Sequence, residues 1–144
     1  MGGNMARRLQ ECGYTVTSVY DVHAPSAAAL AQEIGATHAP DLAAVTAAAD
    51  VIFTVVNDDA SQLAVFSSTG DSLLTGAKGK VFINCATISP STHVEVERRL
   101  QTVGGVSLEG CMASSIPQAR NGTLYLMLSL IHISEPTRLR RISY

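Results

Sequence analysis

The sequence predicts an α/β fold in which short apolar strands alternate with helices around a mostly parallel sheet. Helical and strand patterns alternate along the chain, and residues 51–56 are almost wholly apolar, as expected for a parallel strand covered on both faces. Ser89-Pro90 has the residues of a helix start and Gly35 those of a helix end. With 144 residues, 47% of them hydrophobic and 15% charged, the chain is long enough for one domain with a core.

The first third of the chain predicts three helices and two strands. Each helix follows a cap, a proline or the chain start, and each strand is rich in β-branched or aromatic residues. The expected elements are a helix over 4–11, a strand over 14–20, a helix from Pro25-Ser26 to Gly35, a short strand at 37–38 and a helix from Asp41 to Ala48.

The remainder predicts four more strands and one long helix. Two short helical pieces are expected around a Ser-Thr-Gly loop, and Gly104-Gly105 ends the long helix. The expected elements are a strand over 51–56, helical pieces over 63–66 and 71–74, a strand over 80–84, a helix from Ser89-Pro90 to Val103, and strands over 106–111 and 123–127.

Composition excludes several classes of function. A net charge of −2 gives no electrostatic basis for binding nucleic acid, and no apolar run reaches the ~18 residues of a membrane span. Cys12, Cys85 and Cys111 lack metal-ligand spacing, as do the four histidines, so we expect a reducing compartment and no metal site. The expected location is the cytoplasm, with mitochondria left open because the true N-terminus is expected to lie upstream.

The first six residues, Met-Gly-Gly-Asn-Met-Ala, resemble the end of a dinucleotide-binding glycine turn. Gly2 corresponds to the last glycine, where the missing Cβ lets helix and strand pack closely. Free N–H groups at the helix start, at Gly2, Gly3 and Asn4, are then expected to face a pyrophosphate. The alternative is that Gly2 simply follows a start methionine.

Asp21 ends the next predicted strand, near the ~20-residue distance at which an acidic residue binds the adenosine ribose. A carboxylate there accepts hydrogen bonds from both ribose hydroxyls and repels a 2′-phosphate. The sequence therefore favours NAD, with NADP disfavoured; the alternative is an ordinary strand-end aspartate.

Two loops follow the carboxyl ends of predicted parallel strands, where open α/β sheets bind ligands. The first contains Val56, Asn57 and Asp58, which we expect to contact the cofactor. The second contains Thr87, expected to hydrogen-bond the nicotinamide ribose or the substrate, and Ser89, expected to cap a helix.

These pieces, taken in order, resemble the β-hydroxyacid dehydrogenases, which include 3-hydroxyisobutyrate, tartronate-semialdehyde and threonate dehydrogenases. The resemblance covers about residues 1–127 and is specific as an ordered set, although each motif is short. It is carried by Met1-Gly2-Gly3-Asn4-Met5-Ala6, Tyr20-Asp21, Gly35-Ala36, the strand 49–56, Thr87-Ile88-Ser89-Pro90 and Gly122-Thr123-Leu124.

The resemblance implies an incomplete Rossmann-type doubly wound parallel sheet that lacks its first strand. Residues 1–127 are then a partial dinucleotide-binding domain of an enzyme that transfers a hydride between NAD and a small 3-hydroxy acid. Loss of a central strand leaves unpaired sheet edges, so we expect the chain alone to be poorly folded and inactive. The full-length protein is expected to form a homo-oligomer.

Two departures from the family pattern bear on activity. The family's substrate loop, Asp-Ala-Pro-Val-Ser-Gly-Gly, corresponds here to residues 109–115, with Ala113, Ser114 and Ser115 in place of serine and two glycines. Their N–H groups are still expected to hold a substrate carboxylate. The family's catalytic lysine lies on a C-terminal helix, and neither Lys78 nor Lys80 matches it, so no catalytic residue is assigned.

Other interpretations stay open. A 6-phosphogluconate-type dehydrogenase or an imine reductase is the nearest enzyme alternative, and Asp21 disfavours the NADP-dependent former. A non-catalytic nucleotide-binding or scaffolding member of the superfamily, or a soluble α/β domain of other function, are the alternatives outside catalysis. Residues 128–144 are expected to be a non-native tail, because they resemble translated sequencing-adapter read-through; a native basic tail is the alternative.

Overall fold

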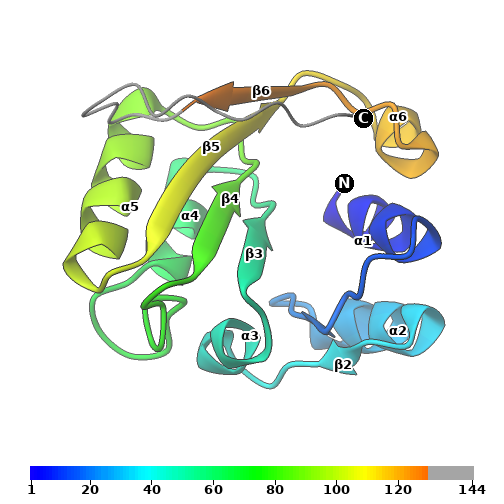
Figure 1. Ribbon diagram of the computed structural model, residues 1–144, viewed down its shortest axis with the longest axis horizontal. Helices are drawn as coiled ribbons and strands as arrows, with labels where there is room; N and C mark the ends of the chain where they lie inside the picture. Colours follow the sequence, from blue (N-terminus) through cyan, green and yellow to red (C-terminus); the bar gives the residue numbers. More distant parts are fainter. Residues whose placement is uncertain (130–144) are drawn as a thin grey trace.

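The computed structural model describes residues 1–129 as an α/β fold with two separate sheets, and the predicted fold class is confirmed (Figure 1). A two-stranded parallel sheet has the order β1-β2, and a four-stranded sheet has the order β3-β4-β5-β6. No strand in residues 1–129 bridges β1 and β3. The expected unpaired edge in the middle of the sheet is therefore present in this part of the chain.

The N-terminal elements follow the sequence prediction apart from one strand. The ladder in 14–20 is limited to Ser18 and Val19, because β2, its partner, has only two residues. Helix α2 ends at Gly35 in the left-handed conformation (φ 71°), and Asp41 caps α3 by accepting the Ala44 N–H at 2.7 Å. The elements are α1 (Gly2–Glu11), β1 (Ser18–Val19), α2 (Ala24–Ile34), β2 (Thr37–His38) and α3 (Leu42–Ala48).

The second part of the chain contains four strands and three helices. β3, β4 and β5 are parallel, whereas β6 joins the edge antiparallel to β5, which is common in mixed sheets. The elements are β3 (Val51–Thr54), α4 (Asp59–Val65), β4 (Val81–Asn84), α5 (Pro90–Thr102), β5 (Val106–Met112), α6 (Ile116–Asn121) and β6 (Leu126–Ser129).

Four details here differ from the sequence prediction. One continuous helix, α4, begins at Asp59 rather than at Leu63, and α6 was not predicted. Residues 71–74 form no helix, because the Asp71 carboxylate instead accepts the N–H groups of Leu42 and Ala43 (2.9 and 3.1 Å) at the start of α3. Strand β6 includes two residues of the expected tail, 128 and 129; the rest of that tail lies outside the described residues.

The core lies between the four-stranded sheet and helices α4 and α5. Its largest members, Phe66 and Phe82, are fully buried and meet edge to face with ring centroids 5.6 Å apart. Val96 and Leu100 of α5 are also fully buried against them. Such aromatic pairs dominate the energetics of a small core.

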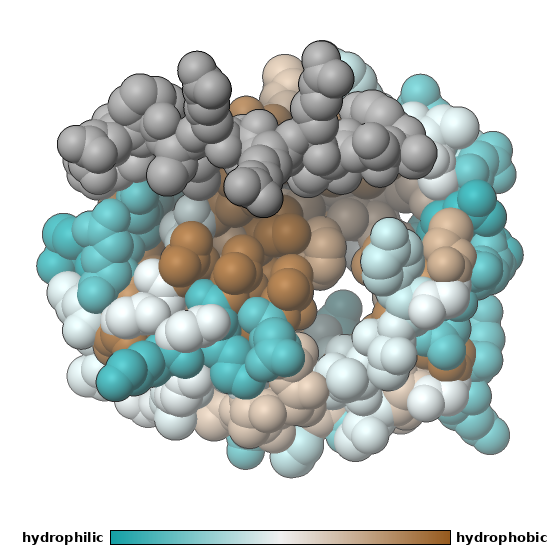
Figure 2. Space-filling model, viewed as in Figure 1, coloured by the Kyte–Doolittle hydropathy of each residue, from teal (hydrophilic) through white to brown (hydrophobic). Residues whose placement is uncertain are grey.

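Strand β3 is not covered on both faces as predicted. Ile52 and Thr54 are buried, but Val51 and Phe53 keep 48% and 39% of their surface exposed. Helix α1, which lies across from the unpaired edge of β3 in Figure 1, contributes no buried residue. Figure 2 shows apolar atoms gathered over the sheet, beside the hollow that separates it from α1.

Candidate cofactor site

The start of α1 lies against Val55, the residue after β3. A Cβ placed on Gly2 would lie 3.3 Å from Cβ of Val55, closer than most side-chain contacts. A Cβ on Gly3 would meet only ordinary contacts at 3.5 Å, from Arg7 and Leu30. The absence of a side chain at Gly2 therefore permits this approach. The N–H groups of Gly2 and Gly3 lie at the start of the helix, whereas those of Asn4 and Met5 donate to the Met1 carbonyl at 3.0 and 3.3 Å.

Asp21 lies immediately beyond β1 and is exposed. Its Oδ1 accepts the backbone N–H of His23 at 2.8 Å, which holds the carboxylate at the strand end. Oδ2 has no hydrogen-bond partner within residues 1–129 and is free to accept ribose hydroxyls.

An ion pair joins α1 to α2 beside this end of the domain. Arg7 donates from Nε and Nη2 to the two carboxylate oxygens of Glu33, at 2.6 and 2.7 Å. This bidentate contact lowers the pKa of the Glu33 carboxyl below its ordinary value. Arg7 also donates to Oδ1 of Asn4 at 3.2 Å, and the Asn4 N–H donates to the Met1 carbonyl at 3.0 Å, so both groups of Asn4 are engaged inside the protein.

The loops after β3 and β4 are joined by one carboxylate. Oδ1 of Asp59 accepts the N–H of Ser89 at 2.8 Å and its hydroxyl at 3.1 Å. These hydrogen bonds, led by the one from the Ser89 backbone, lower the pKa of Asp59. Ser89 is the residue before α5, but its hydroxyl does not cap that helix as predicted, because it is used by Asp59.

The remaining residues predicted to contact the cofactor differ in exposure and in whether their side chains are already hydrogen-bonded. Asn57 and Thr87 are exposed, and Val56 is half-buried. Asp58 instead caps α4, since its Oδ1 accepts the Ser61 N–H at 2.7 Å, and this hydrogen bond lowers its pKa. Its role in holding α4 was not predicted, although an aspartate three residues before a serine at a helix start indicates it.

The predicted substrate loop is largely engaged with its own neighbours. Ala113 donates its N–H to the carbonyl of Tyr125 at 3.0 Å, and Oγ of Ser114 accepts the Tyr125 N–H at 2.9 Å. Ser115 donates its N–H to the side chain of Gln118 at 2.7 Å, at the start of α6. Within residues 1–129, only the Ser114 N–H of the three is left without a partner.

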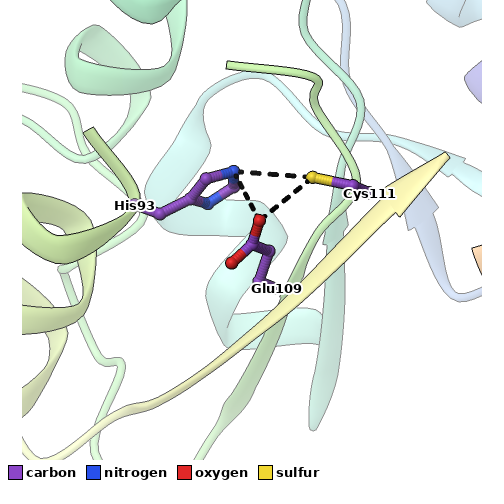
Figure 3. A group of neighbouring side chains, drawn as sticks. All are labelled: His93, Glu109 and Cys111. Carbon is purple, nitrogen blue, oxygen red and sulfur yellow. Dashed lines mark hydrogen bonds and ion pairs between the residues drawn. The ribbon is translucent and has the colours of Figure 1, made fainter. Parts of the chain in front are cut away.

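Three chemically reactive side chains that the sequence prediction did not group meet beside this loop. His93 of α5, Glu109 and Cys111 of β5 bring one ligand atom each within 4.8 Å of one another (Figure 3). Burial, together with Glu109, raises the pKa of the Cys111 thiol to about 11. The i, i+2 spacing of Glu109 and Cys111 on one strand is a signal that could have placed them on one face.

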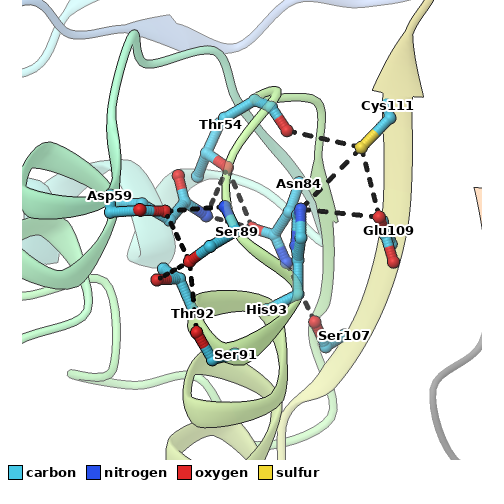
Figure 4. Close-up of polar contacts among 12 residues, drawn as sticks. Thr54, Asp59, Asn84, Ser89, Ser91, Thr92, His93, Ser107, Glu109 and Cys111 are labelled. Carbon is cyan, nitrogen blue, oxygen red and sulfur yellow. Dashed lines mark hydrogen bonds and ion pairs between the residues drawn. The ribbon is translucent and has the colours of Figure 1, made fainter.

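A buried polar network connects the carboxyl ends of the strands beneath the loops (Figure 4). Oδ1 of Asn84 accepts the Thr54 hydroxyl at 2.9 Å and the Gln62 amide at 2.9 Å. Nδ2 of Asn84 donates to the Ser107 hydroxyl at 2.9 Å. The network joins three strands and α4, and fixes the loops that β3 and β4 support.

Residues 1–130 match the family described as the NAD binding domain of 6-phosphogluconate dehydrogenase. The chain belongs to this family. Among curated proteins it is 30% identical over 128 residues to mitochondrial 3-hydroxyisobutyrate dehydrogenase of Mus musculus, an alignment that covers 89% of this chain and 38% of the mouse enzyme. The chain thus spans less than half the length of the relatives that it matches.

Solved structures agree on the fold of this family member. Mycobacterium tuberculosis 3-hydroxyisobutyrate dehydrogenase with L-serine matches with a TM-score of 0.79 and 24% identity, over 89% of this chain and 42% of that one. Psf3 in complex with NADP+ and 2-OPP matches with a TM-score of 0.75 and 23% identity, over 89% and 45% of the two chains. The chain is an NAD(P)-binding Rossmann domain of an oxidoreductase superfamily. None of the helices within residues 1–129 is long and apolar enough to cross a membrane.

Proposed function

We propose that this chain is the cofactor-binding part of an NAD-dependent dehydrogenase that oxidises or forms a small 3-hydroxy acid of the 3-hydroxyisobutyrate type. The observation that carries the proposal is the close approach of Gly2 to Val55, which leaves the first turn of α1 open beside the end of β3. A helix N-terminus of this kind binds a pyrophosphate through backbone N–H groups and the helix dipole.

Asp21 supports a preference for NAD over NADP. Its carboxylate lies exposed at the end of β1 with one oxygen held by the His23 N–H. Accepted hydrogen bonds from ribose hydroxyls involve a charged acceptor and are worth about 1.5–3 kcal/mol each. The 2′-phosphate of NADP would bring a second negative charge to the same position.

The residues that would hold the cofactor lie at the start of α1, after β1, and in the loops after β3 and β4. Gly2 and Gly3 would offer backbone N–H groups, with Asn4 beside them in the same turn, its own N–H held by the Met1 carbonyl. Asp21 would offer the carboxylate, and Thr87 a hydroxyl. Val56, Asn57 and Asp58 complete the set in the loop after β3. The bound nicotinamide accepts or donates the hydride.

We propose that the loop 113–115 contributes to the substrate pocket with fewer donors than its sequence indicates. The Ser114 N–H would meet the substrate carboxylate, since the N–H groups of Ala113 and Ser115 are occupied and the Ser115 hydroxyl donates to Oε1 of Gln118 at 2.9 Å. The mouse relative is a 3-hydroxyisobutyrate dehydrogenase, which supports this substrate class. No residue of 1–129 is proposed to transfer the proton; in the whole protein a lysine outside these residues would do so. The whole protein would form a homo-oligomer.

The proposal is tested by measuring NAD+ and NADP+ affinities of the 144-residue chain and of Asp21→Ser by calorimetry. The wild-type chain should favour NAD+. The substitution should weaken NAD+ binding by about tenfold or more through lost charged hydrogen bonds, and should narrow or reverse the preference. Asp50→Ser, which changes an exposed aspartate away from the site, is the matched control and should leave both affinities unchanged.

Equal affinities for both cofactors, insensitive to Asp21, would contradict the assignment of the ribose site. A chain that binds NAD+ while the longest form of the protein shows no turnover with small 3-hydroxy acids would favour the non-catalytic binding member instead. This second function is supported by the N–H groups of Ala113 and Ser115, which are hydrogen-bonded inside the protein and therefore do not face a substrate.

A further inference from the structure

The three side chains of His93, Glu109 and Cys111 converge from two elements. Glu109 and Cys111 are two positions apart on β5, so both project from the same face of the strand. His93 lies in the first turn of α5 and is 2% exposed, whereas Glu109 keeps 24% of its side chain exposed. A buried imidazole therefore meets a carboxylate and a thiol that solvent can reach (Figure 3).

The contacts of His93 distinguish two kinds of site. In a nucleophile–base–acid relay, the imidazole uses one ring nitrogen for the nucleophile and the other for the carboxylate. Here Nε2 alone faces both partners, at 3.6 Å from Oε1 of Glu109 and 3.8 Å from Sγ of Cys111. The remaining pair, Sγ and Oε1, is 3.2 Å apart. Three lone-pair atoms thus surround a single point.

These separations agree with tetrahedral coordination of a zinc-sized ion. Ordinary Zn–N, Zn–O and Zn–S bond lengths at tetrahedral angles place the ligand pairs at about 3.3 Å (N···O), about 3.6 Å (N···S) and about 3.5 Å (O···S). The observed values are 3.6, 3.8 and 3.2 Å. Each pair requires an adjustment of only a few tenths of an ångström.

We propose that His93, Glu109 and Cys111 form a binding site for Zn²⁺ or a similar thiophilic divalent cation. The nitrogen and sulfur donors disfavour Mg²⁺ and Ca²⁺, which prefer oxygen ligands. On binding, the Cys111 thiol gives its proton to solvent and Sγ bonds the metal, while Glu109 exchanges the thiol hydrogen bond for a metal bond. A water on the exposed side of Glu109 completes four ligands.

The site lies where it would stabilise the substrate side of the domain. It joins the first turn of α5 to β5, just before the loop 113–115 and beside Ala86, whose carbonyl oxygen lies 3.5 Å from Sγ of Cys111. A bound ion would replace three weak polar contacts by coordination bonds. It would therefore stabilise this end of the sheet without contacting the proposed ribose site at Asp21.

The test uses the metal-stripped 144-residue chain titrated with Co²⁺ as a spectroscopic probe and with Zn²⁺ as a competitor. One equivalent of Co²⁺ should give tetrahedral visible bands and a thiolate charge-transfer band, both removed by Zn²⁺. Cys111→Ser should abolish the charge-transfer band, and His93→Gln or Glu109→Gln should weaken binding by about tenfold or more. Cys12→Ser and His23→Gln, which change exposed residues, are matched controls and should bind as the wild type does.

Circular dichroism of each variant shows whether a lost signal reflects lost folding. The proposal is overturned if Co²⁺ gives no saturable tetrahedral spectrum, or if Cys12→Ser reduces it as much as Cys111→Ser does. Loss on Cys85→Ser with Cys111→Ser unaffected would also overturn it. NAD+ affinity is measured on the same samples, so failure of the metal site and failure of the proposed cofactor site are separated.

Discussion

The four-stranded part of the molecule with α3, residues 42–129, and the N-terminal part, residues 1–38, differ in how their elements are held. In the former, Phe66, Phe82 and Leu100 are fully buried between sheet and helices. In the latter, α1 has no buried residue, and α2 buries only Ala27, Ala31 and Ile34. One part is held by a core and the other by small contacts and surface ion pairs.

This difference shows where stability and cofactor binding are located. The predicted NAD contacts Gly2, Gly3, Asn4 and Asp21 all belong to the weakly packed part, whereas the loops after β3 and β4 rest on the core. Regions with few buried apolar contacts open at low free energy. We therefore interpret the expected poor folding of the isolated chain as a property of residues 1–38, with the four-stranded part and α3 retaining structure.

The largest expected effect is in the core. Phe82→Ala should destabilise the chain by about 3–5 kcal/mol, because it removes a fully buried ring and leaves a cavity beside Phe66. Leu9→Ala in α1, which is only half-buried, should cost about 1 kcal/mol or less. Urea unfolding measured by circular dichroism compares the two; similar losses would remove the distinction between the two parts.

The buried network should come next. Asn84→Ala removes the buried acceptor shared by Thr54 and Gln62 and the donor to Ser107. Thr54 and Gln62 keep only their 3.2 Å hydrogen bond to each other. We expect a loss of about 2–3 kcal/mol and weaker NAD+ binding through the displaced loops. Ser107→Ala, which breaks one contact at a half-buried position, is the control; an equal loss in both variants would contradict a shared network.

The sequence predicted some helices and strands more accurately than others. Glycine ends, the Asp41 cap and apolar strands have local causes, so α2, α3, β4 and α5 were predicted within a few residues. The strand 14–20, the exposure of Phe53 and the second cap supplied by Asp71 depend on which elements meet in space. Periodicity does not encode these contacts.

In the candidate site too, local sequence position indicated some residues, whereas other contacts depend on the tertiary structure. Gly2 and Asp21 could be predicted because their chemistry depends on position along one βαβ unit. The partner of Ser115 lies in α6, which was not predicted, and the meeting of His93 with β5 joins residues distant in sequence. The spacing of cysteines and histidines therefore gave no signal for the metal-ligand cluster.

A smaller effect should separate the two adjacent glycines. Gly2→Ala places a methyl group 3.3 Å from Val55 and should weaken NAD+ binding by roughly tenfold, or about 1.4 kcal/mol. Gly3→Ala meets only ordinary contacts and gains up to about 1 kcal/mol of helix propensity. Calorimetry with NAD+ and thermal melting of both variants test this; equal affinities would refute the close-approach role of Gly2.

The smallest effect should be the acid response of surface ion pairs. Arg98 and Arg99 hold the pKa of Glu95 at about 2, below its ordinary 4.5, and Arg7 lowers the pKa of Glu33. Because these folded-state values are depressed, the ionised pairs contribute stability above about pH 4.5, and the contribution is lost as pH falls toward the folded-state pKa. Glu95→Gln and Glu33→Gln should each slightly reduce the fall of melting temperature with acid, since Glu33 is exposed and Glu95 pairs with the exposed Arg98.

Hydrogen exchange of the 144-residue chain with and without NAD+ tests whether the weakly packed N-terminal part binds the cofactor. We expect strong protection of β3, β4, β5 and α5 in both samples. Without NAD+, α1 and β1 should be weakly protected; with NAD+, exchange should slow at the start of α1 and around Asp21. Protection by NAD+ confined to other segments, or no change at α1 and Asp21 at saturating NAD+, would contradict the claim that these residues bind the cofactor.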